Sequence, residues 1–268
     1  MSPARRQPYV HLESQREALV NLVVGSRTDR GRRRRRNEDR VLIRSGRGEA
    51  GAWTLLAVAD GMGGAAAGDI ASEEALRAFD DDIVGCGAAP DAALLRAFGV
   101  ANARVRSLSG ASPKLAGMGT TLVAAIVARE SAWIANVGDS RAYLCGKQSF
   151  VQITRDHSLV EEELRVGVLT PEEAVSSRYR AVLTRNLGSR ADVATDVFGP
   201  IRLTVGDSLM LCSDGLHAVV QPEEMQVAVR SMPAQESCDQ LVALANERGG
   251  PDNISVIVAA TTGKERGT

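Results

Sequence analysis

Apolar residues along the chain follow two spacings, one typical of strands and one of helices. Short runs rich in Val, Ile, Leu and Ala lie between turns that contain Gly, Asp or Ser, which predicts buried strands. Elsewhere apolar residues repeat at helical spacing, as Ala71, Ala75, Phe79 and Ile83 do. The predicted strands are 18–24, 40–45, 53–59, 120–128, 132–137, 141–144, 193–198, 201–205, 208–213 and 253–261, and the predicted long helices follow Asp69 and Pro90 and cover 222–230 and 234–248.

Tight turns separate several neighbouring strands. Residues 138–140 and 206–207 each lie between two apolar runs, and a Gly-rich stretch covers 45–51. We expect each of these turns to close an antiparallel hairpin. Since helices follow both groups of strands, the order predicts an α+β fold, in which two antiparallel β-sheets pack as a sandwich with helices on both outer faces.

The domain organisation follows from the ends of this pattern. We expect a single domain over 19–262, a flexible N-terminal tail at 1–18 and a short C-terminal tail at 263–268. Within the domain, the polar segment 156–185 carries helix-start signals at Ser158 and at Thr170, which is followed by proline. A helical, polar insertion between strands predicts a flap over 156–185.

Composition limits the class of protein. Hydrophobic residues make up 44% of the 268 residues and charged residues 24%, which is ordinary for a globular protein. Apolar runs stay well short of the ~18 residues of a membrane span, and the N-terminus has no apolar signal core, so we expect a cytoplasmic protein without a membrane partner. The four cysteines form no CxxC pair and are expected to be buried free thiols: Cys86, Cys145, Cys212 and Cys238.

The net charge is −1, which gives no general reason to expect a nucleic-acid partner. The local exception is a run of five consecutive arginines at 32–36. Such a run is more often a solvated segment than an arm that binds nucleic acid. We therefore predict no nucleic-acid binding.

Four aspartates stand at the ends of predicted strands. Asp60 and Asp214 each follow an apolar run and precede a glycine, whereas Asp39 and Asp252 each stand before a strand. In an antiparallel sheet the end of one strand lies beside the start of its neighbour, so the four carboxylates can gather at one edge. They would repel one another unless cations lie between them, which predicts a metal site. A site made of oxygen ligands suits Mg²⁺ or Mn²⁺ rather than zinc.

Eight short motifs occur in an order that a chance match does not explain. Over about 24–260 the chain resembles the metal-dependent Ser/Thr protein phosphatases of the type 2C (PPM) family, in their bacterial form. The motifs are GxxRxxNED at Gly31, Arg34, Asn37, Glu38 and Asp39, ADGMGG at 59–64, MGTT at 118–121, NVGDSRAY at 136–143, TRDHS at 154–158, LTRNLG at 183–188, CSDGL at 212–216 and GPDNIS at 250–255.

The resemblance implies roles for the residues at the carboxylate edge. Asp60 would bridge two Mn²⁺ or Mg²⁺ ions, and the Gly61 carbonyl would bind one of them. Asp214 and Asp252 would complete the site of the second ion. Asp39, with Glu38 beside it, would hold metal-bound water on the other side.

Two further residues receive roles from the resemblance. Asp139 matches a residue that helps to bind a third ion. The alternative, which stays open, is that Asp139 is an ordinary aspartate of a turn with no metal. Arg34 matches the arginine that grips the phosphoryl oxygens. Two ions can lower the pKa of a bridging water for in-line attack on phosphorus, so no covalent intermediate is required. The implied partners are phosphorylated proteins, including a bacterial Ser/Thr kinase and its targets, and a monomer is expected.

The chain departs from the family pattern at two places. Residue 62 is methionine, where eukaryotic members commonly carry a histidine taken as the general acid. The leaving alkoxide must then receive its proton from a group other than a histidine at this position. The second departure is at residues 177–181, which lack a His-Pro stretch that many bacterial members have. His157 is expected to be structural and to help fix the helix start near Ser158.

Three rival functions each require sequence features that can be checked in this chain. A dinucleotide-binding oxidoreductase would use Gly61, Gly63 and Ala66 as GxGxxG/A, but the acidic residues that follow, at 80–82, lie in a predicted helix. A catalytically silent interaction protein would be expected to lack one of the metal-site aspartates, and all are present. A cysteine-dependent phosphatase is excluded because no arginine stands six residues after any cysteine; those positions hold Ala92, Val151, Ala218 and Leu244.

Overall fold

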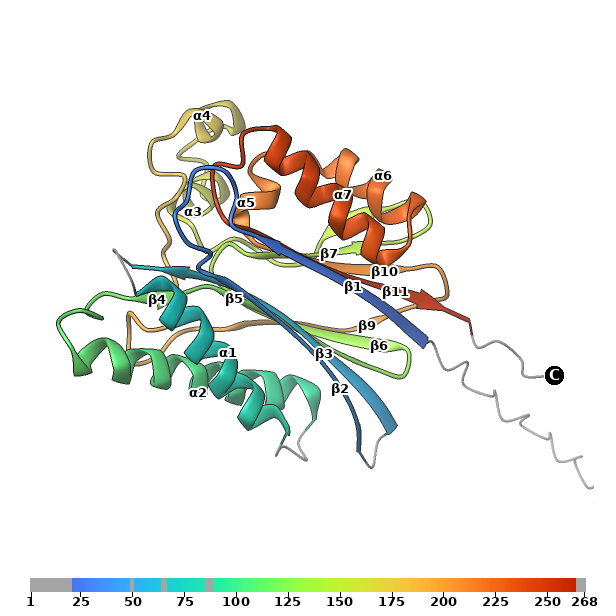
Figure 1. Cartoon of the computed structure of the whole chain (residues 1–268), viewed down its shortest axis with the longest axis horizontal. Helices are drawn as coiled ribbons and strands as arrows, with labels where there is room; N and C mark the ends of the chain where they lie inside the picture. Colours follow the sequence, from blue (N-terminus) through green and yellow to red (C-terminus); the bar gives the residue numbers. More distant parts are fainter. Residues whose placement is uncertain (1–20, 49–50, 64–66, 85–88, 264–268) are drawn as a thin grey trace, which may run out of the picture.

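The computed structural model describes residues 21–48, 51–63, 67–84 and 89–263. Two antiparallel sheets pack face to face and helices cover both outer faces (Figure 1). The first sheet has the order β1-β11-β10-β7-β8, with β1 Asn21–Asp29, β7 Arg141–Cys145, β8 Phe150–Gln152, β10 Ser208–Cys212 and β11 Ile254–Thr262. The second has the order β2-β3-β5-β6-β9, with β2 Asp39–Gly48, β3 Gly51–Met62, β5 Leu122–Ala128, β6 Ser131–Val137 and β9 Asp196–Arg202, and β4 Gly119–Thr120 pairs with β3.

The central strands read as continuous apolar runs because both of their faces are buried. In β3, Leu56 and Val58 lie in the core between the two sheets, whereas Leu55, Ala57 and Ala59 lie in the core under α1 and α2. The strand β10 alternates in the same way between the inter-sheet core and the core under α5, α6 and α7. This alternation follows from the two-residue repeat of a strand and creates three apolar layers.

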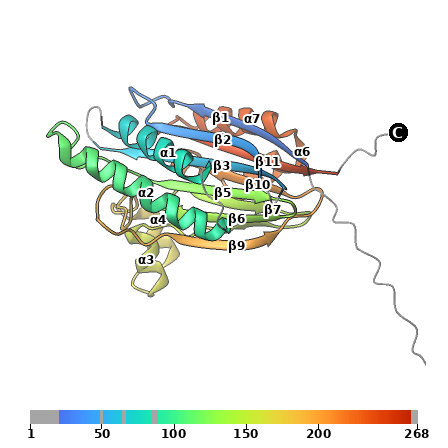
Figure 2. The same ribbon diagram turned by 90° about the horizontal axis from the view of Figure 1, so that it is seen from below.

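The helices lie where their apolar faces meet a sheet. Figure 2 shows α1 and α2 across the outer face of the second sheet, where Phe79 and Phe98 meet edge to face with ring centroids 5.6 Å apart. On the first sheet, α7 packs closely enough that a Cβ at Gly25 would lie 2.4 Å from the backbone nitrogen of Gln235. The helices are α1 Gly68–Val84, α2 Pro90–Ala111, α3 Leu159–Arg165, α4 Pro171–Ser176, α5 Asp214–His217, α6 Pro222–Ser231 and α7 Ala234–Glu247.

The sandwich with outer helices was predicted from the sequence and is confirmed, but two predicted hairpins are wrong. Residues 138–140 lead from β6 in the second sheet to β7 in the first, and residues 206–207 lie between β9 and β10, which are also in different sheets. A tight turn shows that the chain changes direction, but the burial of both strand faces decides which sheet receives the next strand.

Several element bounds also differ from the prediction. The strand β3 continues to Met62, so Asp60 lies inside a strand, and one strand β9 replaces the two predicted at 193–198 and 201–205. The short elements β8 and α5 were not predicted. The Gly-rich stretch 45–51 is paired up to Gly48 and Gly51 instead of forming a long loop, because the pairing of β2 and β3 continues to that point.

The predictions for the cysteines and for the two tails can be checked only in part. Cys145, Cys212 and Cys238 are buried free thiols as predicted, whereas Cys86, the tail at 1–18 and residues 264–268 of the C-terminal tail lie outside the described residues. Within the described part of the chain, no helix has the length and apolar character that a membrane span requires.

Candidate active site

Strand pairing brings the first two aspartates together. Asp39, the first residue of β2, lies directly opposite Asp60 in β3. The backbone of Asp60 is fixed by Thr121, whose Oγ1 accepts a hydrogen bond from the Asp60 amide at 3.0 Å and whose amide donates to the Asp60 carbonyl at 2.9 Å. The side chains of Asp39 and Asp60 therefore leave the same end of the second sheet.

The first sheet supplies the other two aspartates at the same end. Asp214 follows β10 and begins α5, while Asp252 precedes β11, which pairs with β10. Gly215 lies so close to the turn before β11 that a Cβ there would be 1.9 Å from the carbonyl oxygen of Asn253. Only glycine fits this approach, which holds the start of α5 against the turn that carries Asp252.

A buried serine joins the two sheets at this edge. The Ser213 hydroxyl donates to Asp39 Oδ2 at 2.7 Å and accepts from the Ser255 amide at 2.9 Å. Asp39 itself is only 1% exposed. One side chain of the first sheet thus sets the orientation of a carboxylate in the second.

Glu38 and Gly61 are brought together by the backbone. The Gly61 amide donates to the Glu38 carbonyl at 3.2 Å, and the Ser72 hydroxyl donates to the same carbonyl at 2.6 Å. A Cβ at Gly61 would lie 2.0 Å from the carbonyl oxygen of Gly68. The start of α1 therefore packs directly on the predicted metal-binding carbonyl.

The carboxylates raise one another's pKa. Burial, followed by the charges of Asp39 and Asp214, raises the pKa of Asp60 well above its ordinary value. Burial also raises the pKa of Asp39 to about 7 and that of Asp139 to about 8, with neighbouring carboxylates adding to both shifts. The pKa of Asp214 is raised chiefly by burial and next by the charge of Asp252. Such shifts mark a cluster in which ionised carboxylates need a cation.

The donor set fits an oxygen-liganded metal ion. Asp39 Oδ1 and Asp214 Oδ1 are buried and lack any hydrogen-bond partner in the described residues, although each belongs to a strong acceptor. No three His, Cys, Asp or Glu side chains of the described segments form a closed ligand group. Mg²⁺ and Mn²⁺ bind carboxylate, carbonyl and water oxygens, so the two unpartnered carboxylate oxygens match the ligands that these ions prefer.

Arg34 reaches the same edge. Its Nη2 donates to Asp252 Oδ2 at 2.7 Å, with the Arg34 side chain 50% exposed. The charges of Asp60 and Glu38 act on it as well. A half-exposed guanidinium beside the carboxylates is placed to bind an anion that enters from solvent.

Two histidines hold the loop that carries Asp139. The Gly138 amide donates to His157 Nδ1 at 3.1 Å, so the proton of neutral His157 is on Nε2, which lies 3.3 Å from Asp196 Oδ2. From the other side, His217 Nε2 donates to the Asp139 carbonyl at 3.0 Å. His157 thus fixes the Asp139 loop as well as the start of α3, where the Ser158 hydroxyl accepts from the Glu161 amide.

The sequence did not indicate the supporting residues Ser213, Asn253 and His217. Asn253 Oδ1 accepts from the Glu38 amide at 2.8 Å, and its Nδ2 donates to two carbonyls of the loop before β2. Their only local signal is adjacency, because each stands within three residues of a predicted metal-site aspartate. Their partners lie far away in the sequence and become visible only in the folded chain.

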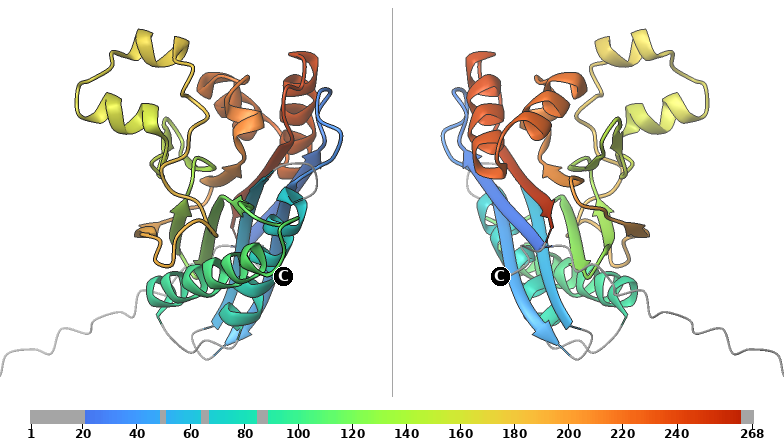
Figure 3. Two further views of the ribbon diagram at one scale, coloured as in Figure 1. Left: turned by 90° about the vertical axis from the view of Figure 1, so that its left-hand side faces the viewer. Right: turned by 90° about the vertical axis from the view of Figure 1, so that its right-hand side faces the viewer.

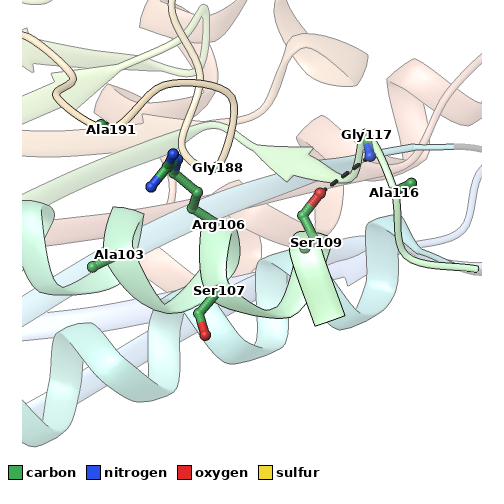
Figure 4. A pocket seen from close by; sticks show the side chains of 9 residues that line it. Ala103, Arg106, Ser107, Ser109, Ala116, Gly117, Gly188 and Ala191 are labelled. Carbon is green, nitrogen blue, oxygen red and sulfur yellow. Dashed lines mark hydrogen bonds between the residues drawn. The ribbon is translucent and has the colours of Figure 1, made fainter. Parts of the chain in front are cut away.

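Met62 lies at the end of β3 and contacts the LTRNLG segment, since Asn186 Nδ2 lies 3.1 Å from its sulfur. A surface groove of about 540 Å³ lies between the last turns of α2, Gly117 and the 188–191 loop (Figure 4). Ser109 Oγ accepts from the Gly117 amide at its wall. The groove contains none of the predicted site residues, so it is separate from the carboxylate edge.

Comparison with known proteins agrees with this architecture. The family described as Protein phosphatase 2C matches residues 24–188. The serine/threonine phosphatase stp of Listeria welshimeri is 39% identical over 248 residues, which are 90% of this chain and 96% of that protein. The PstP of Mycobacterium tuberculosis is 39% identical over 90% of this chain, which corresponds to 46% of its own length.

Solved structures give the same result. The serine/threonine phosphatase PstP/Ppp of Mycobacterium tuberculosis superposes with a TM-score of 0.78 at 38% identity and covers 90% of this chain and 99% of its own. A PstP catalytic domain in complex with two manganese ions also has a TM-score of 0.78, at 36% identity over 91% of this chain. The class is therefore that of the phosphoprotein phosphatases, which hydrolyse phosphoric monoesters. Within that class, the chain belongs to the protein phosphatase 2C family.

Proposed function

We propose that this chain hydrolyses phosphoserine and phosphothreonine in proteins with two Mn²⁺ or Mg²⁺ ions at the carboxylate edge. The observation that carries the proposal is the convergence of four aspartates from both sheets, two of which have a buried, unpartnered oxygen. The relative with two manganese ions in its structure supports the choice of metal. When bound, the ions would supply an activated water and stabilise charge on the phosphoryl group.

The residues of this chain would divide the work of holding the ions. Asp60, the Gly61 carbonyl, Asp214 and Asp252 would hold the two ions. Asp39, whose Oδ2 accepts a hydrogen bond from the Ser213 hydroxyl at 2.7 Å, would hold water at this site. In the same region, Glu38 would act through water and Asp139 would help to bind a third ion.

Arg34 would bind the phosphoryl oxygens. Its Nη2 lies 2.7 Å from Asp252 Oδ2, so the guanidinium stands beside the carboxylates that would hold the ions. A guanidinium can donate two parallel hydrogen bonds to a phosphoryl group, which orients the group as well as binding it. We further propose a monomer with one domain over 19–262 that reverses the action of a bacterial Ser/Thr kinase on its targets.

The test is phosphate release from a phosphothreonine peptide by the purified chain, with Mn²⁺ added and then chelated. We expect release that requires the metal. Asp214→Asn should lower kcat/KM about 100-fold or more, the equivalent of about 3 kcal/mol of transition-state stabilisation. The matched control is Asp81→Asn on the exposed face of α1, which should leave the rate unchanged.

Two outcomes would contradict the proposal. An Asp214→Asn variant with full activity would remove the site assignment. A folded protein that releases no phosphate under any metal would instead favour a silent interaction protein.

A further inference from the structure

The run of arginines belongs to a loop that the metal site does not account for. Residues 30–36, here called the arginine loop, join β1 to β2 and contain six arginines, all exposed to solvent. The chain as a whole has a net charge of −1, so this concentration of positive charge is local. Six like charges in seven residues repel one another, which would spread an unrestrained segment.

The backbone of the arginine loop is nevertheless fixed against the turn that carries Asp252. Asn253 Nδ2 donates to the carbonyls of Arg30 at 2.9 Å and of Arg36 at 2.8 Å, so one side chain joins both ends of the loop. The Arg32 and Arg33 amides donate to the Gly250 carbonyl at 2.8 and 3.2 Å.

Gly31 makes this fit possible. Its φ is +74°, and a Cβ there would lie 2.0 Å from the Asp252 carbonyl oxygen. A side chain at this position would push the loop off the turn. The positive charges are therefore held beside the carboxylate edge and do not need to be ordered when a ligand arrives.

The arginine side chains divide into two groups. Arg34 pairs with Asp252 at 2.7 Å and Arg36 with Asp69 at 3.5 Å, so these two face the edge and the start of α1. In contrast, Arg32, Arg33 and Arg35 make no ion pair with any residue that the structure describes. Figure 3 shows the loop, in blue, at the same end of the molecule as the flap with α3 and α4.

We propose that the arginine loop binds acidic side chains that flank the phosphorylated residue of a protein substrate. The inference rests on the proposed function, in which Arg34 would hold the phosphoryl group. Arg33 and Arg35 are the neighbours of Arg34 in the sequence, one on each side. Substrate carboxylates next to the phosphorylated residue would then meet guanidinium groups that have no competing partner. Because the loop backbone is already fixed, less conformational entropy is lost when the substrate binds.

Two peptides with the same central phosphothreonine test this preference, one flanked by glutamates and the other by glutamines. With Mn²⁺, we expect the chain to hydrolyse the acidic peptide with a kcat/KM roughly 3- to 10-fold higher, the range that two exposed ion pairs give. The ratio should approach one at high salt, because exposed charges are screened. Arg33→Gln with Arg35→Gln should remove the preference, and Arg33→Glu with Arg35→Glu should invert it.

The matched control changes the same charge at the opposite end of the sheets. Arg47→Gln with Lys147→Gln alters two exposed residues near the far ends of β2 and β7, and the ratio should stay as in the unchanged chain. A structural effect of the loop variant would lower hydrolysis of both peptides equally and leave the ratio unchanged, which would overturn the inference. Thermal unfolding of each variant confirms that the fold is kept.

The outcomes separate this inference from the proposed function. If the chain hydrolyses both peptides equally at low salt, the inference fails and the phosphatase activity stands. If the chain hydrolyses neither peptide nor p-nitrophenyl phosphate with Mn²⁺, the proposed function itself fails. If a short single-stranded RNA binds through Arg33 and Arg35 while the peptides are not distinguished, the loop is a nucleic-acid site and the inference is wrong.

Discussion

Individual residues without a charge decide how the carboxylates of this site are oriented. The Ser213 hydroxyl donates to Asp39, while Asn253 holds the Glu38 amide and both ends of the arginine loop. Glycine at 61 and 215 allows backbone segments to approach more closely than any Cβ would permit. A small change at such a position should therefore move the carboxylates without removing one.

Gly215→Ala is the sharpest change of this kind. The added Cβ would lie 1.9 Å from the Asn253 carbonyl oxygen, so α5 and the turn before β11 must move apart. We expect the variant to be less stable by about 1–3 kcal/mol, as for other overpacked positions. Its activity should also fall and require more Mn²⁺, because Asp214 and Asp252 separate.

Urea denaturation and a Mn²⁺ titration of phosphate release measure the two effects. Gly99→Ala is the matched control, since a Cβ in that part of α2 meets no atom within 4 Å. It should leave the Mn²⁺ requirement unchanged and raise the stability by up to about 1 kcal/mol, because alanine favours a helix interior more than glycine does. An equally active and stable Gly215→Ala variant would show that this contact does not position the aspartates.

At the level of elements, hydrogen bonds connect the Asp139 loop to the segment 156–185, which we predict to act as a flap. The His157 amide donates to the Gly138 carbonyl at 2.9 Å, and its ring accepts from the Gly138 amide. At the base of the flap, the Thr184 amide donates to the His157 carbonyl and the Leu159 amide to the Val182 carbonyl, both at 2.8 Å. Movement of the flap base would therefore be transmitted to the loop of Asp139.

Substitution of His157 tests this connection. In His157→Asn the side-chain oxygen can accept from the Gly138 amide in place of Nδ1, whereas His157→Leu keeps the bulk and leaves that amide without a partner. We expect His157→Leu to lose about 1–3 kcal/mol of stability, the cost of a buried unpaired donor. The Asn variant should retain more of both stability and activity.

The comparison requires urea unfolding together with kcat and KM at several Mn²⁺ concentrations. If His157 positions the Asp139 loop, the Leu variant should lower kcat more than it raises KM, and His157→Asn should partly restore kcat. Equal behaviour of the two variants would contradict the role of the Gly138 hydrogen bond.

On the scale of the whole molecule, the site exists only when the two sheets are packed together. Asp39 and Asp60 belong to the second sheet, whereas Asp214 and Asp252 adjoin the first. Packing buries carboxylates that repel one another, and metal binding would relieve this repulsion. The stability of the chain should therefore depend jointly on metal and on pH.

The sign of the pH dependence follows from the raised pKa values. Asp39, with a pKa of about 7, and Asp139, with a pKa of about 8, favour the folded state at low pH. Their contribution is lost as the pH rises through these values, because the unfolded carboxylates ionise near pH 4. His157 and His217 have lowered pKa values, so they are neutral in the folded protein, while in the unfolded chain they lose their protons only around pH 6.5. They therefore oppose the fall slightly up to about pH 7.5 and do not contribute above it.

We therefore expect the free energy of unfolding of the chelated protein to fall by roughly 1–3 kcal/mol between about pH 6.5 and 8. Saturating Mn²⁺ should raise the stability and remove most of this slope, since the metal binds the ionised form. Urea denaturation at each pH measures the free energy of unfolding. The Asp139→Asn substitution should reduce its dependence on pH in the upper part of this range. A chelated protein with pH-independent stability would contradict the proposed cluster.

Much of the fold and the candidate site could be predicted from the sequence. Asp60, Asp214, Asp39 and Asp252 stand beside apolar runs whose strand character is a local property, so their position at or near the ends of strands could be predicted without a structure. The helical repeat of α1 and the capping pattern at Thr170 are local in the same way, and the structure contains both elements. The sequence alone therefore determined most of the longer elements and the placement of the four aspartates beside strands.

The tertiary structure decided which sheet each strand joins and which side chains support the site. The turns at 138–140 and 206–207 look like hairpin turns locally, but they cross between sheets because β7 and β10 bury both of their faces in the first sheet. The hydrogen bond from Ser213 to Asp39 spans 174 positions, and that from Asn253 to Arg30 spans 223. Such contacts depend on the packing of distant segments, about which local periodicity carries no information.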